Sequence, residues 1–162
     1  MSLDRFKLDG RLALVTGSSQ GIGLAIATGL AGAGAAVVVN GRDAAKVAAA
    51  ARAIAAKGCR VHEAAFDVTD PKAAAAAVER IERDFGAIDI LVNNAGIQRR
   101  TPLEEFSVET WREVMATNLD SLFYVSKPVA QRMIARKRGA IVNICSVMSE
   151  LGRPTVVPYT AA

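Results

Sequence analysis

Cysteine and histidine are scarce in this sequence, and their scarcity argues against several kinds of chemistry. There are two cysteines and one histidine among 162 residues. Cys59 and Cys145 are far apart and lack metal-ligand spacing, so we expect two buried or half-buried free thiols in a reducing compartment. His62 falls in a predicted strand, where we expect a structural role. The sequence therefore predicts no metal site.

Aromatic residues and clusters of basic residues are also lacking. Aromatics make up 5% of the chain, too few for a platform on which nucleic-acid bases stack. The formal net charge of +4 suits anionic ligands, but the basic residues are scattered along the chain. These features disfavour nucleic-acid binding and favour a small anionic molecule as partner.

A membrane span is not expected either. The uncharged stretch 21–39 is long enough to suggest one, but glycines within 32–34 divide it into an alanine-rich helix and a β-branched strand. The charged residues of 4–9 follow no apolar run, so no signal peptide is visible. We expect a cytoplasmic protein that does not bind membranes.

What the sequence does contain is an alternation of apolar strands and helices. Hydrophobic residues make up 51% of the chain, enough for one domain spanning 1–162. The pattern predicts strands near 12–16, 36–40, 60–65, 88–92 and 140–145, with helices near 22–33, 44–57, 71–85 and 108–135. It indicates an α/β fold with a Rossmann-type doubly wound parallel sheet in the order 3-2-1-4-5. Ligands should bind at the carboxyl ends of strands one, four and five.

A glycine-rich turn follows the first predicted strand. Gly17 permits a sharp exit from the strand, Gly21 lets the backbone approach a diphosphate, and Gly23 lets the next helix lie close to the sheet. The amino end of that helix then faces the anion. The spacing differs from the common G-x-G-x-x-G pattern, so a tight strand–helix connection remains an alternative. The predicted cofactor contacts of the turn are Gly17, Ser19, Gln20, Gly21, Ile22 and Gly23.

The end of the second strand bears on the choice of cofactor. A carboxylate at this place binds the ribose 2′-hydroxyl of NAD, whereas this sequence has Asn40, Gly41 and Arg42. We therefore expect Asn40 and Arg42 to contact the cofactor and NADP(H) to be favoured over NAD(H). A solvated surface cation is the alternative for Arg42, and Asp43 is predicted to cap the next helix.

Two further strand ends offer cofactor contacts. After strand four, Asn94 can satisfy neighbouring backbone groups, while Ala95 and Gly96 leave room for a ribose or a flat ring. A simple turn is the alternative. Asp67, after strand three, can accept a hydrogen bond from an adenine amino group, but capping the helix at 71–85 is the alternative for it or for Asp70.

The predicted helix 108–135 carries two residues that do not fit an apolar stripe. Asn118 falls within that stripe and must be hydrogen-bonded, either as a structural amide or as an anchor for a water in a proton relay. Pro128 interrupts the pattern, so we expect a kink or break there.

A hydroxyl and a phenol follow strand five. Ser146 comes at the carboxyl end of the strand, and Tyr159 follows 13 positions later. If both face the edge that holds the glycine turn, they lie beside the nucleotide.

In this order and spacing, the motifs Thr-Gly-x3-Gly-x-Gly and Asn-Asn-Ala-Gly, with Asn118, Ser146 and Tyr159, resemble the short-chain dehydrogenase/reductase superfamily. The resemblance implies hydride transfer between nicotinamide C4 and a substrate carbon. Tyr159 would exchange a proton with the substrate oxygen, Ser146 would hold that oxygen, and Asn118 would anchor a relay water. It also implies that Asp67 and Val68 border the adenine and that Asn94, Ala95 and Gly96 line the ribose.

The superfamily motif Tyr-x-x-x-Lys places its lysine one residue beyond Ala162. A free phenol titrates near pH 10, so proton transfer at neutral pH needs such a cation nearby. We therefore expect these residues to be the N-terminal part of a longer fold with further strands. The 162-residue form should turn over orders of magnitude more slowly while binding nucleotide weakly. The resemblance also implies a homo-oligomer, a tetramer or dimer built through helices near 108–135 and the helix that starts at Tyr159.

Two loops narrow the resemblance. Segments 96–100 and 144–153 are similar to those of gluconate 5-dehydrogenases, which implies interconversion of D-gluconate and 5-dehydro-D-gluconate. A sugar acid needs a cation for its carboxylate, and the candidates are Arg99, Arg100 and Arg153. A surface charge or subunit contact is the alternative for each. The other functions considered are a 3-oxoacyl thioester reductase, an inactive nucleotide-binding fragment and a flavin-binding module.

Overall fold

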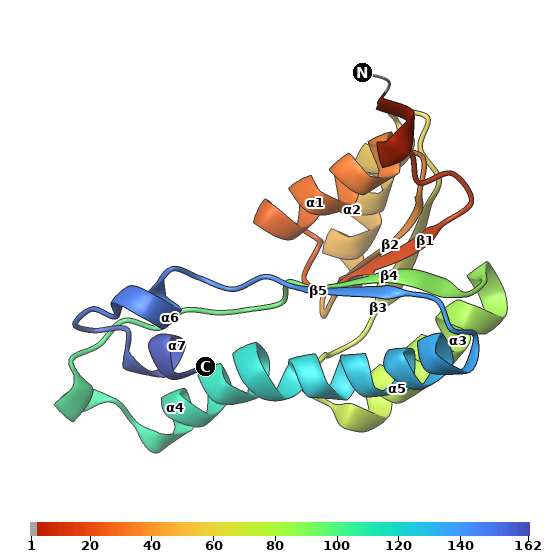
Figure 1. The fold of residues 1–162 in the computed structure, drawn as a ribbon. Helices are drawn as coiled ribbons and strands as arrows, with labels where there is room; N and C mark the ends of the chain where they lie inside the picture. The colour runs from red at the N-terminus through yellow and green to blue at the C-terminus, as the bar shows by residue number, and fades with distance from the viewer. Residues whose placement is uncertain (1–2) are drawn as a thin grey trace.

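The computed structural model describes residues 3–162 around a five-stranded parallel sheet (Figure 1). The sheet order β3-β2-β1-β4-β5 confirms the predicted topology. Both faces are covered at the centre of the sheet, which is why β1 is a continuous apolar run in the sequence. The strands are β1 (Leu12–Val15), β2 (Ala36–Gly41), β3 (Val61–Ala65), β4 (Ile88–Asn93) and β5 (Ala140–Asn143).

Two hydrophobic cores lie on opposite faces of the sheet. Helices α1 (Gly21–Gly32) and α2 (Ala44–Ala55) cover one face, where Val15 and Val37 pack. Helices α3 (Pro71–Phe85) and α5 (Ser121–Ala135) cover the other. The chain thus forms three layers, with successive residues of β1 directed alternately into the two cores. The predicted helices all exist, with bounds shifted by a few residues.

A third group of helices lies beyond the carboxyl ends of β4 and β5. It consists of α4 (Val108–Met115), α6 (Met148–Leu151) and α7 (Val157–Ala161) (Figure 1). Helix α7 contacts both α4 and α6. Short 3₁₀ turns at Leu3–Phe6 and Leu103–Glu105 complete the described elements.

The predicted helix 108–135 is one path of three parts. Helix α4 runs into a π-helical turn, Ala116–Asp120, which leads directly into α5. The expected break at Pro128 is wrong, because α5 continues through it. Val125 and Val129 are buried on either side of Pro128, and this packing holds the helix together where one backbone hydrogen bond is lost. The irregular turn lies at Asn118 instead.

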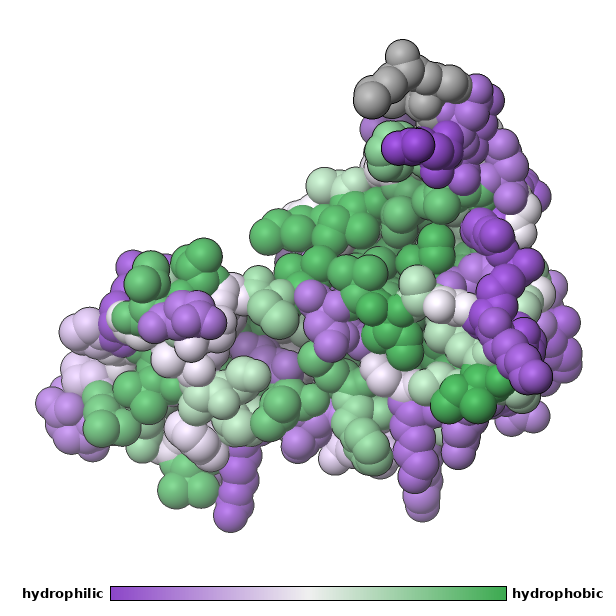
Figure 2. Space-filling view, in the orientation of Figure 1, coloured by the Kyte–Doolittle hydropathy of each residue, from purple (hydrophilic) through white to green (hydrophobic). Residues whose placement is uncertain are grey.

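The first helix and the last strand leave apolar surface uncovered. Helix α1 carries no charged residue, and Figure 2 shows hydrophobic surface gathered over it. All four residues of β5 are exposed, and Cys145 just after it is exposed rather than buried as expected. Cys59 is half-buried, and both thiols are free. Within residues 3–162, no helix is long and apolar enough to cross a membrane.

His62 lies in β3, as predicted from the sequence. Its ring stacks on Phe85 with ring centroids 4.0 Å apart. Burial, with the nearby charge of Arg60 as a second cause, lowers the pKa of His62. The imidazole therefore packs between β3 and the end of α3, away from the strand ends that form the site.

Candidate active site

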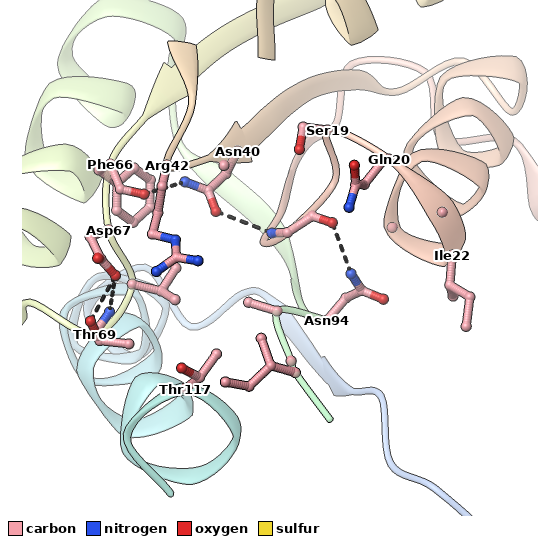
Figure 3. A pocket seen from close by; sticks show the side chains of 18 residues that line it. Ser19, Gln20, Ile22, Asn40, Arg42, Phe66, Asp67, Thr69, Asn94 and Thr117 are labelled. Carbon is pink, nitrogen blue, oxygen red and sulfur yellow. Dashed lines mark hydrogen bonds between the residues drawn. The ribbon is translucent and has the colours of Figure 1, made fainter. Parts of the chain in front are cut away.

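A pocket of about 390 Å³ opens at the carboxyl ends of β1 to β4 (Figure 3). Every residue predicted to contact the cofactor lines it: Gly17, Ser19, Gln20, Gly21, Ile22, Gly23, Asn40, Arg42, Asp67, Val68, Asn94, Ala95 and Gly96. The expected location needs one correction. The ends of β2 and β3 contribute along with those of β1 and β4, whereas β5 contributes no lining residue.

The glycine turn has the steric requirements that the sequence predicted. A Cβ on Gly17, whose φ is +62°, would lie 2.8 Å from the Ala95 Cα. A Cβ on Gly23 would lie 2.5 Å from both Asn94 Nδ2 and the Gly17 carbonyl oxygen. Gly21 has φ +59° and open space around its Cα, so an anion can approach its backbone. Contact with a diphosphate itself stays a prediction.

Helix α1 begins without a side-chain cap, unlike the next three helices. The N-cap residue Gln20 makes no side-chain cap hydrogen bond, whereas Asp43 caps α2, Asp70 caps α3 and Ser107 caps α4. The first N–H groups of a helix have no partner inside the helix and carry its positive dipole end. At α1 these groups face the pocket and are available to an anion. The prediction that Asp43 caps a helix is confirmed.

Thr16 and Asn94 join the turn to the end of β4. The Thr16 hydroxyl oxygen accepts hydrogen bonds from the backbone N–H groups of Asn94 and Ala95, at 3.0 and 3.1 Å. Asn94 Nδ2 donates to the Thr16 and Gly17 carbonyl oxygens, at 3.0 and 3.2 Å. The two strand ends are therefore held at a fixed separation.

The other polar side chains of the pocket differ in how far their hydrogen-bonding groups are used within the protein. Asn40 is buried and all its side-chain hydrogens are donated to protein carbonyls. Asp67 accepts from the backbone N–H and hydroxyl of Thr69, so it closes its own turn, while Asp70 caps α3. Arg42 is exposed, and within the described residues its guanidinium makes no hydrogen bond or ion pair. Figure 3 shows it extending into the pocket.

Sequence reasoning missed five lining residues, which are Gly41, Phe66, Thr69, Ile97 and Thr117. All but Thr117 adjoin predicted contacts after β2, β3 and β4, so their position was the available signal. Thr117 precedes Asn118 in the π-helical turn, and no local pattern brings that turn to the strand ends. Its place depends on hydrogen bonds across the fold.

The predicted catalytic residues come from three segments beyond β4 and β5, and none of them lines the pocket. Asn118 is half-buried and hydrogen-bonded to both backbone groups of Ile97, which lines it. Ser146 precedes α6, and its Oγ accepts from the Met148 N–H at 3.2 Å. Tyr159 lies on α7, which contacts α4 and α6. Their catalytic roles stay predictions.

The three candidate arginines are not equivalent. Arg99 donates two hydrogen bonds to the Glu113 carboxylate on α4, at 3.1 and 2.8 Å. Arg100 Nε donates to Gln98 Oε1 at 3.1 Å. Arg153 is exposed and has no hydrogen-bond or ion-pair partner within residues 3–162. Arg153 is thus the candidate with its charge fully available.

Residues 11–162 match the model of the family described as short chain dehydrogenase. The chain belongs to this family. The fold predicted from the sequence, with its sheet order, is confirmed.

Two proteins with sequences similar to this chain have names that refer to sugar acids. Gluconate 5-dehydrogenase of Gluconobacter oxydans (strain 621H) is 56% identical over 158 residues, which are 98% of this chain and 62% of that protein. The 5-keto-D-gluconate 5-reductase of Escherichia coli (strain K12) is 46% identical over 159 residues, covering 98% of this chain and 63% of that protein.

A solved structure of similar name superposes closely. The crystal structure of a gluconate 5-dehydrogenase from Burkholderia cenocepacia J2315, in complex with NADP and tartrate, has a TM-score of 0.95 and 54% identity. It covers 99% of this chain and 63% of that chain. This chain therefore spans a little over three-fifths of the length of the relatives it matches, 62% and 63% for the two curated ones.

Proposed function

We propose that this short chain dehydrogenase is an NADP(H)-preferring oxidoreductase that interconverts D-gluconate and 5-dehydro-D-gluconate. The observation that carries the proposal is the pocket itself. It combines an uncapped helix start, a turn open to anions at Gly21, and the free guanidinium of Arg42. The NADP in the similar Burkholderia structure supports the choice of nucleotide.

The residues present fit an adenine dinucleotide with a 2′-phosphate. The Ser19 hydroxyl lies beside Gly41, since a Cβ on that glycine would be 3.0 Å from Ser19 Oγ. Arg42 follows Gly41, and both Ser19 and Arg42 line the pocket at this end of β2. The carboxylate of Asp43 is occupied in capping α2. A 2′-phosphate therefore gains a charged partner at Arg42, and no free carboxylate of β2 repels it.

The diphosphate and the adenine have their own partners. The uncapped N–H groups of α1 would hold the diphosphate, with Gly21 allowing close approach. Asp67 and Val68 would border the adenine, and Asn94, Ala95 and Gly96 the ribose of the nicotinamide. When bound, the cofactor supplies the hydride donor or acceptor.

Proton transfer falls to the residues on the segments beyond β4 and β5. The Ser146 Oγ accepts a hydrogen bond from a backbone N–H, which leaves its own hydrogen free to hold the substrate oxygen. The Tyr159 phenol makes no hydrogen bond within residues 3–162, so its proton is available to the same oxygen. Asn118 anchors the segment that connects these groups to the pocket.

The substrate carboxylate is assigned to Arg153, with Arg100 as second contact. Arg99 is less suited, because its ion pair with Glu113 must break before it can bind another carboxylate. Changing Arg153 to alanine should raise KM for 5-dehydro-D-gluconate by about tenfold or more, the value of one charge-assisted hydrogen bond. Changing Arg99 to alanine is the matched control and should raise it less.

A coupled assay tests the proposal. The protein is given 5-dehydro-D-gluconate or a 3-oxoacyl thioester with NADPH. Oxidation of the nucleotide is measured at high protein concentration over long times, because slow turnover is expected of these 162 residues. Preferential turnover of the sugar acid supports the proposal. Preference for the thioester overturns the substrate assignment, and NADPH binding without turnover of either substrate overturns the enzymatic one.

A further inference from the structure

We propose that Asn40 is a positioning residue for the glycine turn and does not itself discriminate between NADP(H) and NAD(H). This inference rests on the proposed binding of NADP(H). In doubly wound folds a side chain at the end of the second strand commonly reaches the ribose. Here β2 ends at Gly41, and the side chain of Asn40, one residue earlier, is buried.

The carboxamide of Asn40 is an internal connector. The side chain is 1% exposed. Its Oδ1 accepts a hydrogen bond from the Gly17 N–H at 3.1 Å, and its Nδ2 donates to the carbonyl oxygens of Ala64 and Phe66 at 3.1 and 3.2 Å. Both amide hydrogens are thus used within the protein. The side chain joins the glycine turn, β2 and the end of β3 (Figure 3).

The backbone of Asn40 adds two further bonds to the same turn. Its N–H donates to Ser18 Oγ at 2.9 Å, and its carbonyl accepts from the Ser18 N–H at 2.8 Å. On the other side of the turn, Asn94 Nδ2 donates to the Gly17 carbonyl. Gly17 is therefore held through its N–H by one amide and through its carbonyl by another. Two buried or half-buried amides fix its positive φ.

A carboxylate at position 40 would disrupt the hydrogen bonds that the Asn40 side chain makes. Aspartate keeps an acceptor for the Gly17 N–H but lacks the two hydrogens that Ala64 and Phe66 receive. Its second oxygen would face those two carbonyl oxygens without a proton between them, in a site closed to water. Burying an unpaired charge in this way is strongly unfavourable. The turn would shift, and binding of either nucleotide would weaken.

Residue 42 is in the opposite situation. Arg42 is exposed and has no protein partner within the described residues, although it lines the same pocket. A substitution there changes the charge presented to the ribose and leaves the hydrogen bonds of the turn intact. Discrimination between the two nucleotides can therefore be altered at this position without loss of the fold.

Three variants separate these roles: Asn40→Asp, Asn40→Ala and Arg42→Asp. Dissociation constants for NADPH and NADH are measured by calorimetry well below each melting temperature, and exchange of the Gly17 amide is followed by NMR without nucleotide. We expect Asn40→Asp to raise the dissociation constants of NADPH and NADH alike by about tenfold or more. The ratio of the two affinities should stay unchanged. Arg42→Asp should shift that ratio about tenfold or more toward NADH, with an unchanged melting temperature.

The exchange measurement tests the positioning role directly. Asn40→Ala removes the acceptor of the Gly17 N–H, so that amide should exchange about tenfold or more faster. The proposal is overturned if Asn40→Asp binds NADH more tightly than the unchanged protein does, or if Asn40→Ala leaves Gly17 exchange unaltered. If Asn40→Asp does not fold, the alanine variant decides alone. If the unchanged protein binds neither nucleotide, the proposed function fails, while Gly17 exchange still decides the role of Asn40.

Discussion

Asn118 and Ile97 are joined by a reciprocal pair of hydrogen bonds. The Ile97 N–H donates to Asn118 Oδ1 at 2.8 Å, and Asn118 Nδ2 donates to the Ile97 carbonyl at 2.9 Å. The side-chain amide thus pairs with the segment after β4 as a neighbouring strand would. Because Asn118 lies in the π-helical turn and Ile97 lines the pocket, this pair sets how far the helix stands from the nucleotide site.

Replacing Asn118 with leucine should therefore loosen the site as well as the fold. Both backbone groups of Ile97 lose their partner, and we expect the free energy of unfolding to fall by about 2 kcal/mol. Urea unfolding measures this, and calorimetry should show weaker NADPH binding. Leu119→Ala, at an exposed neighbour in the same turn, is the control and should change stability by less. Equal effects of the two variants would contradict the role given to Asn118.

Two glycines of α1 provide a matched pair for the close approach of helix and sheet. Gly23→Ala places a methyl group 2.5 Å from a backbone oxygen and should cost about 1–3 kcal/mol of stability, with weaker NADPH binding. Gly29→Ala adds the same methyl group where nothing lies within 4 Å and should stabilise the helix by up to about 1 kcal/mol. Thermal unfolding measures both. A Gly23→Ala variant as stable as Gly29→Ala would show that the contact is unimportant.

The lowered pKa of Asp89 predicts how the stability of the protein depends on pH. Burial alone would raise its pKa, but hydrogen bonds from Arg138 and the Leu12 N–H, together with the charges of Arg138 and Arg11, lower the pKa of Asp89 below its ordinary value of 3.8. The unfolded chain then binds this proton more readily than the native one. The stabilisation is complete above the unfolded pKa and is lost as the pH falls through the native pKa.

Asp89→Asn tests that sign. At pH 7 the variant should be about 1–3 kcal/mol less stable, because a buried charged acceptor is lost. The difference from the unchanged protein should shrink as the pH falls below about 4, which urea unfolding at a series of pH values will show. Asp84→Asn, at a more exposed aspartate paired with Arg83, is the control. A difference that grows toward acid pH would contradict the assignment.

Substitutions of the two tyrosines and of two serines distinguish an effect on catalysis from an effect on nucleotide binding. Tyr159→Phe and Ser146→Ala should each lower kcat by about 10²- to 10⁴-fold, the usual contribution of general acid–base catalysis. NADPH affinity should not change, since neither residue lines the pocket. Tyr124→Phe on α5 and Ser149→Ala on α6 are the matched controls. Unchanged kcat in Tyr159→Phe would remove the phenol from the mechanism.

The sequence was sufficient for what depends on local pattern. The glycine turn, the strand ends and the sheet order all follow from residues close together in the chain, and Gly17 and Gly23 have the steric reasons predicted for them. Arg42 and Asn40 were both predicted as cofactor contacts. Only the structure shows that Asn40 donates both amide hydrogens to the carbonyl oxygens of Ala64 and Phe66. Those partners lie in another strand and carry no sequence signal.

Long-range contacts explain the other differences. The pairing of Arg99 with Glu113 joins a loop to α4 across fourteen positions, whereas the sequence offered only a surface charge or a subunit contact as alternatives for Arg99. Pro128 was expected to break its helix because propensity treats the helix in isolation. Packing of Val125 and Val129 against the sheet overrides that preference, and the irregular turn forms where Asn118 binds Ile97.

Direct titration of the protein with NADPH and with NADH, with and without Arg42→Ala, is the most direct test that this pocket binds a 2′-phosphorylated dinucleotide. We predict saturable binding of both, with NADPH favoured by about tenfold or more and that preference lost in Arg42→Ala. Tighter binding of NADH, or no binding of either nucleotide, would contradict it.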